Sequence, residues 1–328
     1  MAPQSDDISG LTIGPYVLDH LIGQGGFASV YAGHATADGN PVALKVLKAR
    51  FGGDAQFEAR FRAESEVAAQ IDHPNIVTIR EAGRADGHTY QVMDLYSDSL
   101  GSLIKREGPL SEDRATSIAQ DVLAGLQYAH EGGRLHRDIK VDNVLLRADG
   151  SAVIADFGLP RVVSGYTSAT GVDMTIGTPQ YISPEQAQGR EMDARSDLYS
   201  VGVTLYRTVT GEAPFHSNDW YELARMHVED RPPSLRTRRP ELSSRFERVV
   251  LKCLAKHPDD RYGSAAALLD ELTEIKNASR TTETFGVSPA QTDEMVTFIS
   301  TARPRWQVIA VAVLVVAAVA YLVVLFGG

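Results

Sequence analysis

Two stretches near the middle of the chain combine side chains that suit phosphoryl transfer. The first, "LHRDIKVDNVLL", contains Asp138, Lys140 and Asn143. Asp138 can accept the proton of an attacking hydroxyl group, and Lys140 can neutralise charge on the group in transfer. Asn143 and Asp156, the latter in "VIADFGL", offer oxygen ligands to a hard cation such as Mg²⁺. An isolated Asp-Gly pair after a strand would indicate only a tight turn, but this ordered set predicts a catalytic site.

A glycine-rich stretch near the amino terminus, "LIGQGGFASVYAGHA", is a candidate phosphate-binding loop. Gly23 and Gly25 fit the pattern G-x-G-x-x-G, and Ala28 stands where the third glycine is expected. A dinucleotide-binding loop would open a helix, whereas strand-like residues lie on both sides here. The glycines are therefore expected to turn a hairpin that covers a triphosphate. The methyl group of Ala28 restricts the backbone only where φ is positive, so we expect a modest weakening of nucleotide affinity and no loss of function.

A lysine and a glutamate extend this arrangement. "VALK" places Lys45 on a strand, from which its amine can reach phosphate oxygens, and Glu64 follows within a helical pattern. A single lysine on a strand is usually a solvated edge residue. The order of glycine hairpin, lysine strand and helix glutamate is more specific, and it predicts that Glu64 pairs with Lys45 and fixes it.

The elements that must position these residues fall into two regions. Apolar alternation predicts strands in the stretches "YVLDHLI", "ASVYAGHA", "PVALKVL", "IVTIREAGR" and "TYQVMDLY". A helical pattern, "DAQFEARFRAESEVAAQI", interrupts them. After Leu103 helices dominate, as in "SEDRATSIAQDVLAGLQYAHEGG", which begins with a serine cap and ends in glycines. The sequence therefore predicts an α+β fold with a small strand-rich lobe and a larger helical lobe.

Composition excludes some classes of protein. The formal net charge of −10 argues against a nucleic-acid partner, because sequence-independent binding to phosphate requires a basic surface. The one cysteine, Cys253, cannot form a disulfide within the chain, which fits a reducing compartment. The first ten residues, "MAPQSDDISG", lack the basic and apolar segments of a signal peptide.

One carboxy-terminal stretch differs from the rest of the chain. Residues 306–326, "WQVIAVAVLVVAAVAYLVVLF", carry no charge, and as a helix they would span roughly 31 Å, the thickness of a bilayer core. The alternative, a buried core helix, fits such uniform hydrophobicity less well. Arg303 and Arg305 precede the stretch, so the positive-inside rule predicts a single-pass anchor in the inner membrane with the bulk of the protein in the cytoplasm.

From about Tyr16 to Leu272 the chain resembles the eukaryotic-like (Hanks-type) Ser/Thr protein kinases of bacteria. The motifs that carry the resemblance are "GQGGFASV", "VALK", "FRAESE", "HPNIV", "HRDIKVDN", "DFG", "GTPQYISPEQ", "DARSDLYSVGVTLYRTVTGEAPF" and "HPDDRY". The resemblance implies a bilobal kinase fold. It also implies transfer of the γ-phosphate of ATP, with Mg²⁺ or Mn²⁺, to serine or threonine of protein substrates. Lys140 and Thr178 resemble the Ser/Thr-specific branch and not the tyrosine kinases.

The resemblance also assigns residues to roles. Catalytic roles fall to Asp138, Lys140, Lys45 and Glu64, and metal binding to Asn143 and Asp156. The residues implied to bind ATP are Ile22, Gly23, Gln24, Gly25, Gly26, Phe27, Ala28, Val30, Ala43, Lys45, Met93, Asp94 and Tyr96. The residues implied in regulation are Arg137, which would grip an activation-loop phosphate, the pair Glu185 and Arg261, and the autophosphorylation sites Thr170 and Thr175.

The predicted domain plan has a kinase domain at its centre. The plan comprises a flexible segment 1–15, a kinase domain 16–275, a polar juxtamembrane linker 276–305, a membrane helix 306–326 and a tail 327–328. Because only the tail follows the helix, we expect no external sensor domain. Family resemblance suggests an FHA-domain protein, a PP2C-type phosphatase and a second copy of the chain as partners.

Two other functions compete with an active protein kinase. A pseudokinase scaffold would bind nucleotide or partners without phosphotransfer, but the intact catalytic set argues against it. A small-molecule kinase would lack the docking segment "GTPQYISPEQ" and Arg261, which serve protein substrates in the family. The departures from the family pattern at Ala28, Pro160 and Ser183 remove no catalytic group.

Overall fold

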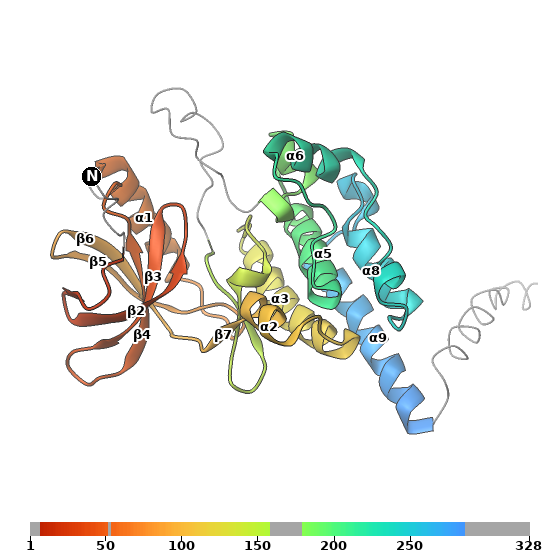
Figure 1. Cartoon of the computed structure of the whole chain (residues 1–328), viewed down its shortest axis with the longest axis horizontal. Helices are drawn as coiled ribbons and strands as arrows, with labels where there is room; N and C mark the ends of the chain where they lie inside the picture. Colours follow the sequence, from red (N-terminus) through yellow and green to blue (C-terminus); the bar gives the residue numbers. More distant parts are fainter. Residues whose placement is uncertain (1–6, 52–53, 158–178, 286–328) are drawn as a thin grey trace, which may run out of the picture. The chain divides into compact units, whose positions relative to one another are not determined.

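An antiparallel sheet and one helix form the amino-terminal part of the protein. A computed structural model describes residues 7–51, 54–157 and 179–285 (Figure 1). The six strands lie in the order β1-β2-β3-β4-β6-β5. Their bounds are β1 Thr12–Ile13, β2 Tyr16–Gln24, β3 Ala28–Ala35, β4 Pro41–Leu47, β5 Ile79–Ala85 and β6 His88–Met93. Helix α1, Ala55–Ala68, joins β4 to β5. These elements confirm the predicted strand-rich lobe with one main helix.

The sheet is strongly curled. Strands β2 and β5 are not neighbours in the sheet order, yet Tyr16 and Tyr90 both donate hydrogen bonds to the carboxylate of Glu81, at 2.8 and 2.9 Å. The backbone N–H of Gly14 also reaches Asp86 Oδ2 at 2.8 Å, beside the β5–β6 turn. Apolar side chains from five strands fill the inside of the curl: Ile13, Leu18, Tyr31, Val42, Leu44, Val46, Tyr90 and Val92.

The regular fold begins before residue 16, so the prediction of a flexible segment over residues 1–15 is wrong for its second half. Strand β1 pairs with β2, and Ile13 is fully buried in the sheet core. The backbone N–H of Gly10 donates to Leu18 O at 2.6 Å. A two-residue strand is too short to show a period of two in the sequence, so only its pairing partner identifies it.

Helices make up most of the remaining chain. Their bounds are α2 Leu100–Glu107, α3 Glu112–Glu131, α4 Pro184–Ala187, α5 Ala194–Thr210, α6 Trp220–Glu229, α7 Leu235–Arg238, α8 Ser244–Cys253 and α9 Ala265–Phe285. Three short strands, β7 Asp98–Ser99, β8 Val144–Leu146 and β9 Ala152–Ile154, form a second sheet. The predicted cap of α3 is present, since Ser111 accepts from Arg114 N. Helix α5 is buried along nearly its whole length and is central to the helical core.

The carboxy-terminal predictions are only partly covered by the described residues. Helix α9 continues through Phe285, beyond the domain boundary predicted at residue 275 and into the predicted linker. Within residues 7–285, where the structure describes them, no helix combines the length and apolar character needed to cross a bilayer. The predicted membrane helix, residues 306–326, lies outside the described residues.

Candidate active site

Asp197, in the first turn of α5, holds the loop that carries Asp138. Its carboxylate is 1% exposed and accepts hydrogen bonds from the backbone N–H groups of His136 and Arg137, at 2.8 and 2.7 Å. His130 Nε2 lies 2.8 Å from the same carboxylate. Arg137 has φ of 68°, a left-handed conformation that a non-glycine residue adopts only when its surroundings enforce it. The buried carboxylate of Asp197 supplies that enforcement.

His136 links this loop to the segment that contains Asp156. Its Nε2 lies 2.8 Å from the carbonyl oxygen of Ala155, and its Nδ1 lies 3.2 Å from the backbone N–H of Asp138. Because a carbonyl only accepts and a backbone N–H only donates, Nε2 carries the proton. Burial lowers the pKa of His136, which keeps the ring neutral. The ring also packs edge-on against Phe157, with centroids 4.6 Å apart.

The three chemically active residues of the loop contact one another. Lys140 Nζ donates to Asp138 Oδ2 at 2.9 Å. Asn143 Nδ2 donates to the carbonyl oxygen of Asp138 at 2.8 Å and to its Oδ2 at 3.2 Å. With its nitrogen on Asp138, Asn143 presents the amide oxygen as its cation ligand. Asp138 and Lys140 stay partly exposed, at 25% and 17%, so a substrate hydroxyl can reach them.

Lys45 and Asp156 form an ion pair across the cleft between the strand-rich and helical regions. Lys45 Nζ lies 2.6 Å from Asp156 Oδ1, although the two residues are far apart in the sequence. Burial raises the pKa of Asp156, but the Lys45 ammonium outweighs it and holds that pKa below its usual value. Asp156 is therefore ionised. Glu64 lies in α1, but its side chain is outside the described positions, so its predicted pairing with Lys45 stays a prediction.

The donor set fits a hard divalent cation. Mg²⁺ is usually held by one or two carboxylates together with substrate phosphates and water, and not by a complete protein cage. Asp156 supplies an ionised carboxylate beside Lys45, and Asn143, whose backbone oxygen accepts from Ala155 N at 2.8 Å, supplies an amide oxygen. Across the described ranges no group of three or more His, Cys, Asp or Glu side chains could hold a metal ion by itself. The residues present therefore suit a cation shared with a phosphate ligand.

An apolar cluster lines the same cleft. Four residues from the ATP-binding prediction, Val30, Ala43, Met93 and Tyr96, belong to it. Its other members, which the sequence prediction did not include, are Val77, Ile79, Leu95, Leu145, Val153 and Ala155. Leu145 lies two positions after Asn143, so the usual alternation of strand β8 is the signal that would have found it. Asp94, a further residue of the ATP-binding prediction, accepts a hydrogen bond from Arg80 Nε at 2.6 Å.

The glycine-rich stretch turns a hairpin, as predicted. Strand β2 ends at Gln24, β3 begins at Ala28, and the two pair in antiparallel fashion. This arrangement excludes a dinucleotide-binding loop, which would lead into a helix. Ala28 is 6% exposed and does not have a positive φ; among the described non-glycine residues only Asp86, Arg137 and Asp156 do. The third position of the loop therefore imposes no strain on an alanine.

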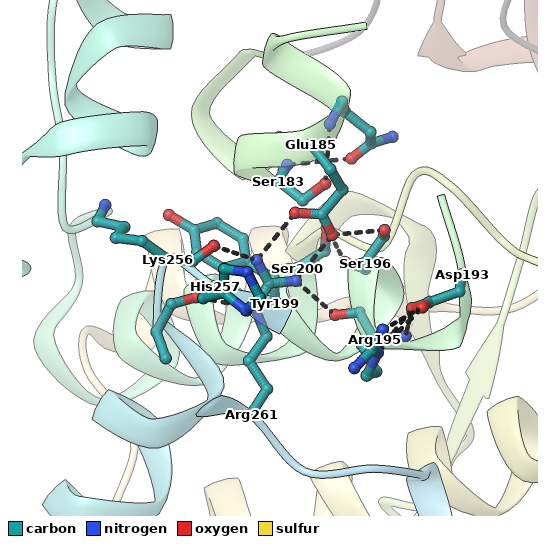
Figure 2. Close-up of polar contacts among 12 residues, drawn as sticks. Ser183, Glu185, Asp193, Arg195, Ser196, Tyr199, Ser200, Lys256, His257 and Arg261 are labelled. Atoms are coloured by element: carbon teal, nitrogen blue, oxygen red, sulfur yellow. Dashed lines mark hydrogen bonds and ion pairs between the residues drawn. The ribbon is translucent and has the colours of Figure 1, made fainter. Parts of the chain in front are cut away.

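Glu185 and Arg261 lie together in the helical region, in a buried bidentate pair (Figure 2). Arg261 Nη1 and Nη2 donate to the two carboxylate oxygens of Glu185 at 2.7 and 2.9 Å, and both side chains are at most 3% exposed. Ser196 adds a hydrogen bond to Glu185 Oε1 at 2.5 Å. Burial raises the pKa of Glu185, but the hydrogen bonds from Arg261 and Ser196 hold it below its usual value. The pair ties α4 to the chain before α9.

Comparison with known proteins identifies the family. The family description "Protein kinase domain" matches residues 16–273. The chain belongs to the protein kinase family. It is 37% identical to the serine/threonine-protein kinase PknB of Mycobacterium leprae over 266 residues, 79% of this chain and 43% of that protein. It is 36% identical to the serine/threonine-protein kinase pkn3 of Myxococcus xanthus over 290 residues, 85% of this chain and 53% of that one.

A solved kinase domain has the same fold. The kinase domain of Mycobacterium tuberculosis PknI matches with a TM-score of 0.61 and 29% identity, over 81% of this chain and 98% of that domain. The predicted bilobal kinase fold is therefore confirmed. This chain spans about half the length of the curated relatives it matches, or less.

The predicted phosphorylation sites Thr170 and Thr175 lie outside the described residues. Arg137 Nε is buried, and no acceptor for it lies within the described part of the chain. Sequence reasoning missed His227 of α6, whose Nδ1 lies 2.9 Å from the hydroxyl of Tyr199 beside Arg261. A lone histidine in an amphipathic helix gives no sequence signal that its ring will contact Tyr199.

Proposed function

We propose that this chain is a Ser/Thr protein kinase that transfers the γ-phosphate of ATP to hydroxyl groups of protein substrates. The observation that carries the proposal is the meeting, at one cleft, of Asp138, Lys140 and Asn143 with the Lys45–Asp156 pair. These residues come from separate segments, and together they supply the carboxylates, ammonium groups and amide oxygen that the reaction requires. The two relatives compared above are serine/threonine-protein kinases, which supports the choice of hydroxyl acceptor.

Positioning and electrostatics would provide most of the catalysis. Asp138 would orient the incoming hydroxyl and take its proton, and Lys140, already 2.9 Å from Asp138, would stabilise charge on the phosphoryl group. Lys45 would hold the phosphates of the nucleotide. Asp156 and Asn143 would hold a divalent cation such as Mg²⁺, which supplies neutralisation of phosphate charge. On binding of nucleotide and cation, the Lys45 ammonium would also contact a phosphate, and the Asp156 carboxylate would also contact the cation.

A pseudokinase is the less supported alternative. Asp138, Asn143 and Asp156 are all present, and they make the contacts that phosphotransfer would require. A kinase that acts on small molecules is also less supported, because Glu185 and Arg261 brace the docking segment that serves protein substrates in the family.

Incubation with labelled ATP and Mg²⁺ tests the proposal. Wild-type protein is expected to label itself or a generic protein substrate. Asp138→Asn and Lys45→Met are expected to reduce labelling by at least about a hundredfold, since each removes a group that acts in the transition state. Thermal unfolding of the three proteins controls for misfolding. Equal labelling by all three folded proteins would contradict the proposed activity.

Membrane attachment, autophosphorylation and partners extend the proposal. The uncharged stretch 306–326, preceded by Arg303 and Arg305, supports a single-pass anchor with the kinase domain in the cytoplasm. Autophosphorylation at Thr170 or Thr175 is supported by Arg137, whose guanidinium has a buried nitrogen without an acceptor in the described ranges. An FHA-domain protein, a PP2C-type phosphatase and a second copy of the chain are proposed partners on family resemblance alone.

A further inference from the structure

A small apolar cluster lies at the root of the glycine loop. Ala28, the first residue of β3, and Leu47, the last of β4, are cross-strand partners, and both are buried. Phe61 of α1 is 6% exposed and completes the cluster, with the partly buried Phe51 packed against it. The methyl group of Ala28 is the only side-chain atom that this position contributes. A glycine here would therefore remove the contribution of this position to the cluster.

The tip of the same loop contacts the segment between β4 and α1. The rings of Phe27 and Phe51 lie with their centroids 5.2 Å apart. Arg50 Nη2 donates to the carbonyl oxygen of Gly26 at 2.7 Å, and its guanidinium lies 4.9 Å from the Phe51 ring centroid. The backbone N–H of Lys48 donates to Phe27 O at 2.9 Å. The root and the tip of the loop are thus attached to one contiguous stretch of chain that leads into α1.

We propose that Ala28 is a positioning residue that couples the nucleotide-covering loop to helix α1. The inference rests on the proposed function, since it requires that the loop covers ATP. Because Ala28 shares one buried cluster with its strand partner Leu47 and with Phe61 of α1, a displacement of α1 is expected to displace the root of the loop with it. Helix α1 also carries Glu64, so the coupling would link the position of the loop to that of the Glu64 backbone.

This coupling reverses the sign expected from the sequence alone. The sequence pattern predicts that alanine in the third position weakens nucleotide affinity relative to glycine. Since Ala28 has no positive φ and its methyl group is buried, glycine is instead expected to weaken affinity, because it loses apolar contact and gains backbone freedom. The burial of one methyl group sets an upper limit of about fourfold on this change in the dissociation constant.

A double-mutant cycle on the full chain tests the coupling. The dissociation constant of a non-hydrolysable ATP analogue with Mg²⁺ is measured by calorimetry for wild type, Ala28→Gly, Phe61→Leu and the double variant. Phe61→Leu keeps an apolar side chain in the core, and thermal unfolding verifies that each protein is folded. We expect Ala28→Gly to weaken binding by up to about fourfold in wild type and less than about twofold beside Phe61→Leu, since contacting residues are not additive.

A matched control separates coupling from the general effect of glycine in a strand. Ala32 is buried in the same strand but is not part of the cluster, so Ala32→Gly and Phe61→Leu should be additive. Additive effects of Ala28→Gly and Phe61→Leu on a wild type that binds nucleotide would overturn the inference and leave the proposed function standing. A wild-type protein that binds no nucleotide would overturn both.

Discussion

Buried charge in this kinase domain is placed where single side chains hold several segments together. Asp197 accepts from two backbone N–H groups and lies beside His130, so one carboxylate sets the path of the catalytic loop. Arg261 binds Glu185 through two hydrogen bonds and also donates to the carbonyl oxygens of Ala255 and Lys256. Each of these buried charged groups has several hydrogen-bond partners, so the removal of one partner is expected to lower the stability of the fold substantially.

Glu185→Gln should destabilise the protein strongly. The substitution preserves the shape of the side chain but leaves the Arg261 guanidinium, which is fully buried, without its opposite charge. We expect a loss of about 3 kcal/mol in the free energy of unfolding, measured by urea denaturation. Asp259→Asn is the control, because Asp259 is 72% exposed in its pair with Arg195 and an exposed pair contributes at most about 1 kcal/mol. Equal losses in the two variants would contradict this assignment.

His227 should make stability depend on pH in the acidic range. Burial, together with the smaller effect of the Lys256 ammonium, lowers the pKa of His227 from an ordinary 6.5 to about 3. Between those values the unfolded chain binds a proton that the folded protein does not, so stability rises with pH, by about 1.4 kcal/mol per pH unit. Above pH 6.5 the buried histidine causes no loss of stability by this linkage, and the loss grows as the pH falls from 6.5 toward 3.

The measurement is urea unfolding from pH 7 to pH 5 for wild type and His227→Gln. The variant should show a shallower loss of stability on acidification, although its stability at pH 7 is lower. His216→Gln, at an exposed position, is the control for the loss of a histidine. An unchanged slope in His227→Gln would show that this residue does not carry the acid dependence.

At the scale of elements, the loop and helix of the strand-rich lobe share their packing. Strand β3 begins and strand β4 ends at the cluster that includes Phe61 of α1, so the glycine loop, the strand of Lys45 and the helix of Glu64 meet there. In the helical lobe, α5 is the element that positions several residues, because it is buried along nearly its whole length and carries both Asp197 and Tyr199. One element in each lobe therefore positions several residues of the site.

The carboxy-terminal stretch is the element whose role is tested most directly by its removal. We expect the full chain to fractionate with membranes and to be released by detergent but not by high salt, because residues 306–326 are uncharged and apolar. A variant that ends after residue 305 should appear in the supernatant with its kinase activity retained. Equal partition of the two chains into the membrane fraction would show that another part of the protein binds the membrane.

At the scale of the whole molecule, the cleft contains paired charges of opposite sign, which a nucleotide and a cation could both contact. Lys45 is paired with Asp156, and Lys140 with Asp138, so the site is nearly balanced in charge before nucleotide binds. Binding of a triphosphate with a divalent cation adds charge of both signs and can preserve that balance. Nucleotide is therefore expected to stabilise the folded protein only when the cation is present.

Autophosphorylation is the prediction that involves the whole molecule, because one copy of the chain serves as the enzyme and a segment of the same or another copy as the substrate. We expect mass spectrometry of active protein to find phosphate on Thr170 or Thr175, and Thr170→Ala with Thr175→Ala to lower activity about tenfold or more. The Asp138→Asn variant should carry no phosphate. An unmodified segment in an active preparation would refute the prediction.

The sequence by itself determined the residues of the site that lie close together in the chain. Asp138, Lys140 and Asn143 share one loop, so their mutual contacts follow from local spacing, and the strands around the glycines required a hairpin. The pairing of Glu185 with Arg261 was predictable only through family resemblance, because nothing local connects them.

Only the tertiary structure decided which distant segments meet. The contact of Lys45 with Asp156 joins positions 111 residues apart, and the burial of Ala28 against Phe61 joins a strand to a helix. Strand β1 likewise exists only through its pairing with β2. Local patterns determine which face of an element is apolar, but the partner of that face is selected by packing of the whole core. In the sequence Ala28 is an unfavourable replacement for the third glycine of the loop, whereas in the fold its side chain is buried in an apolar cluster.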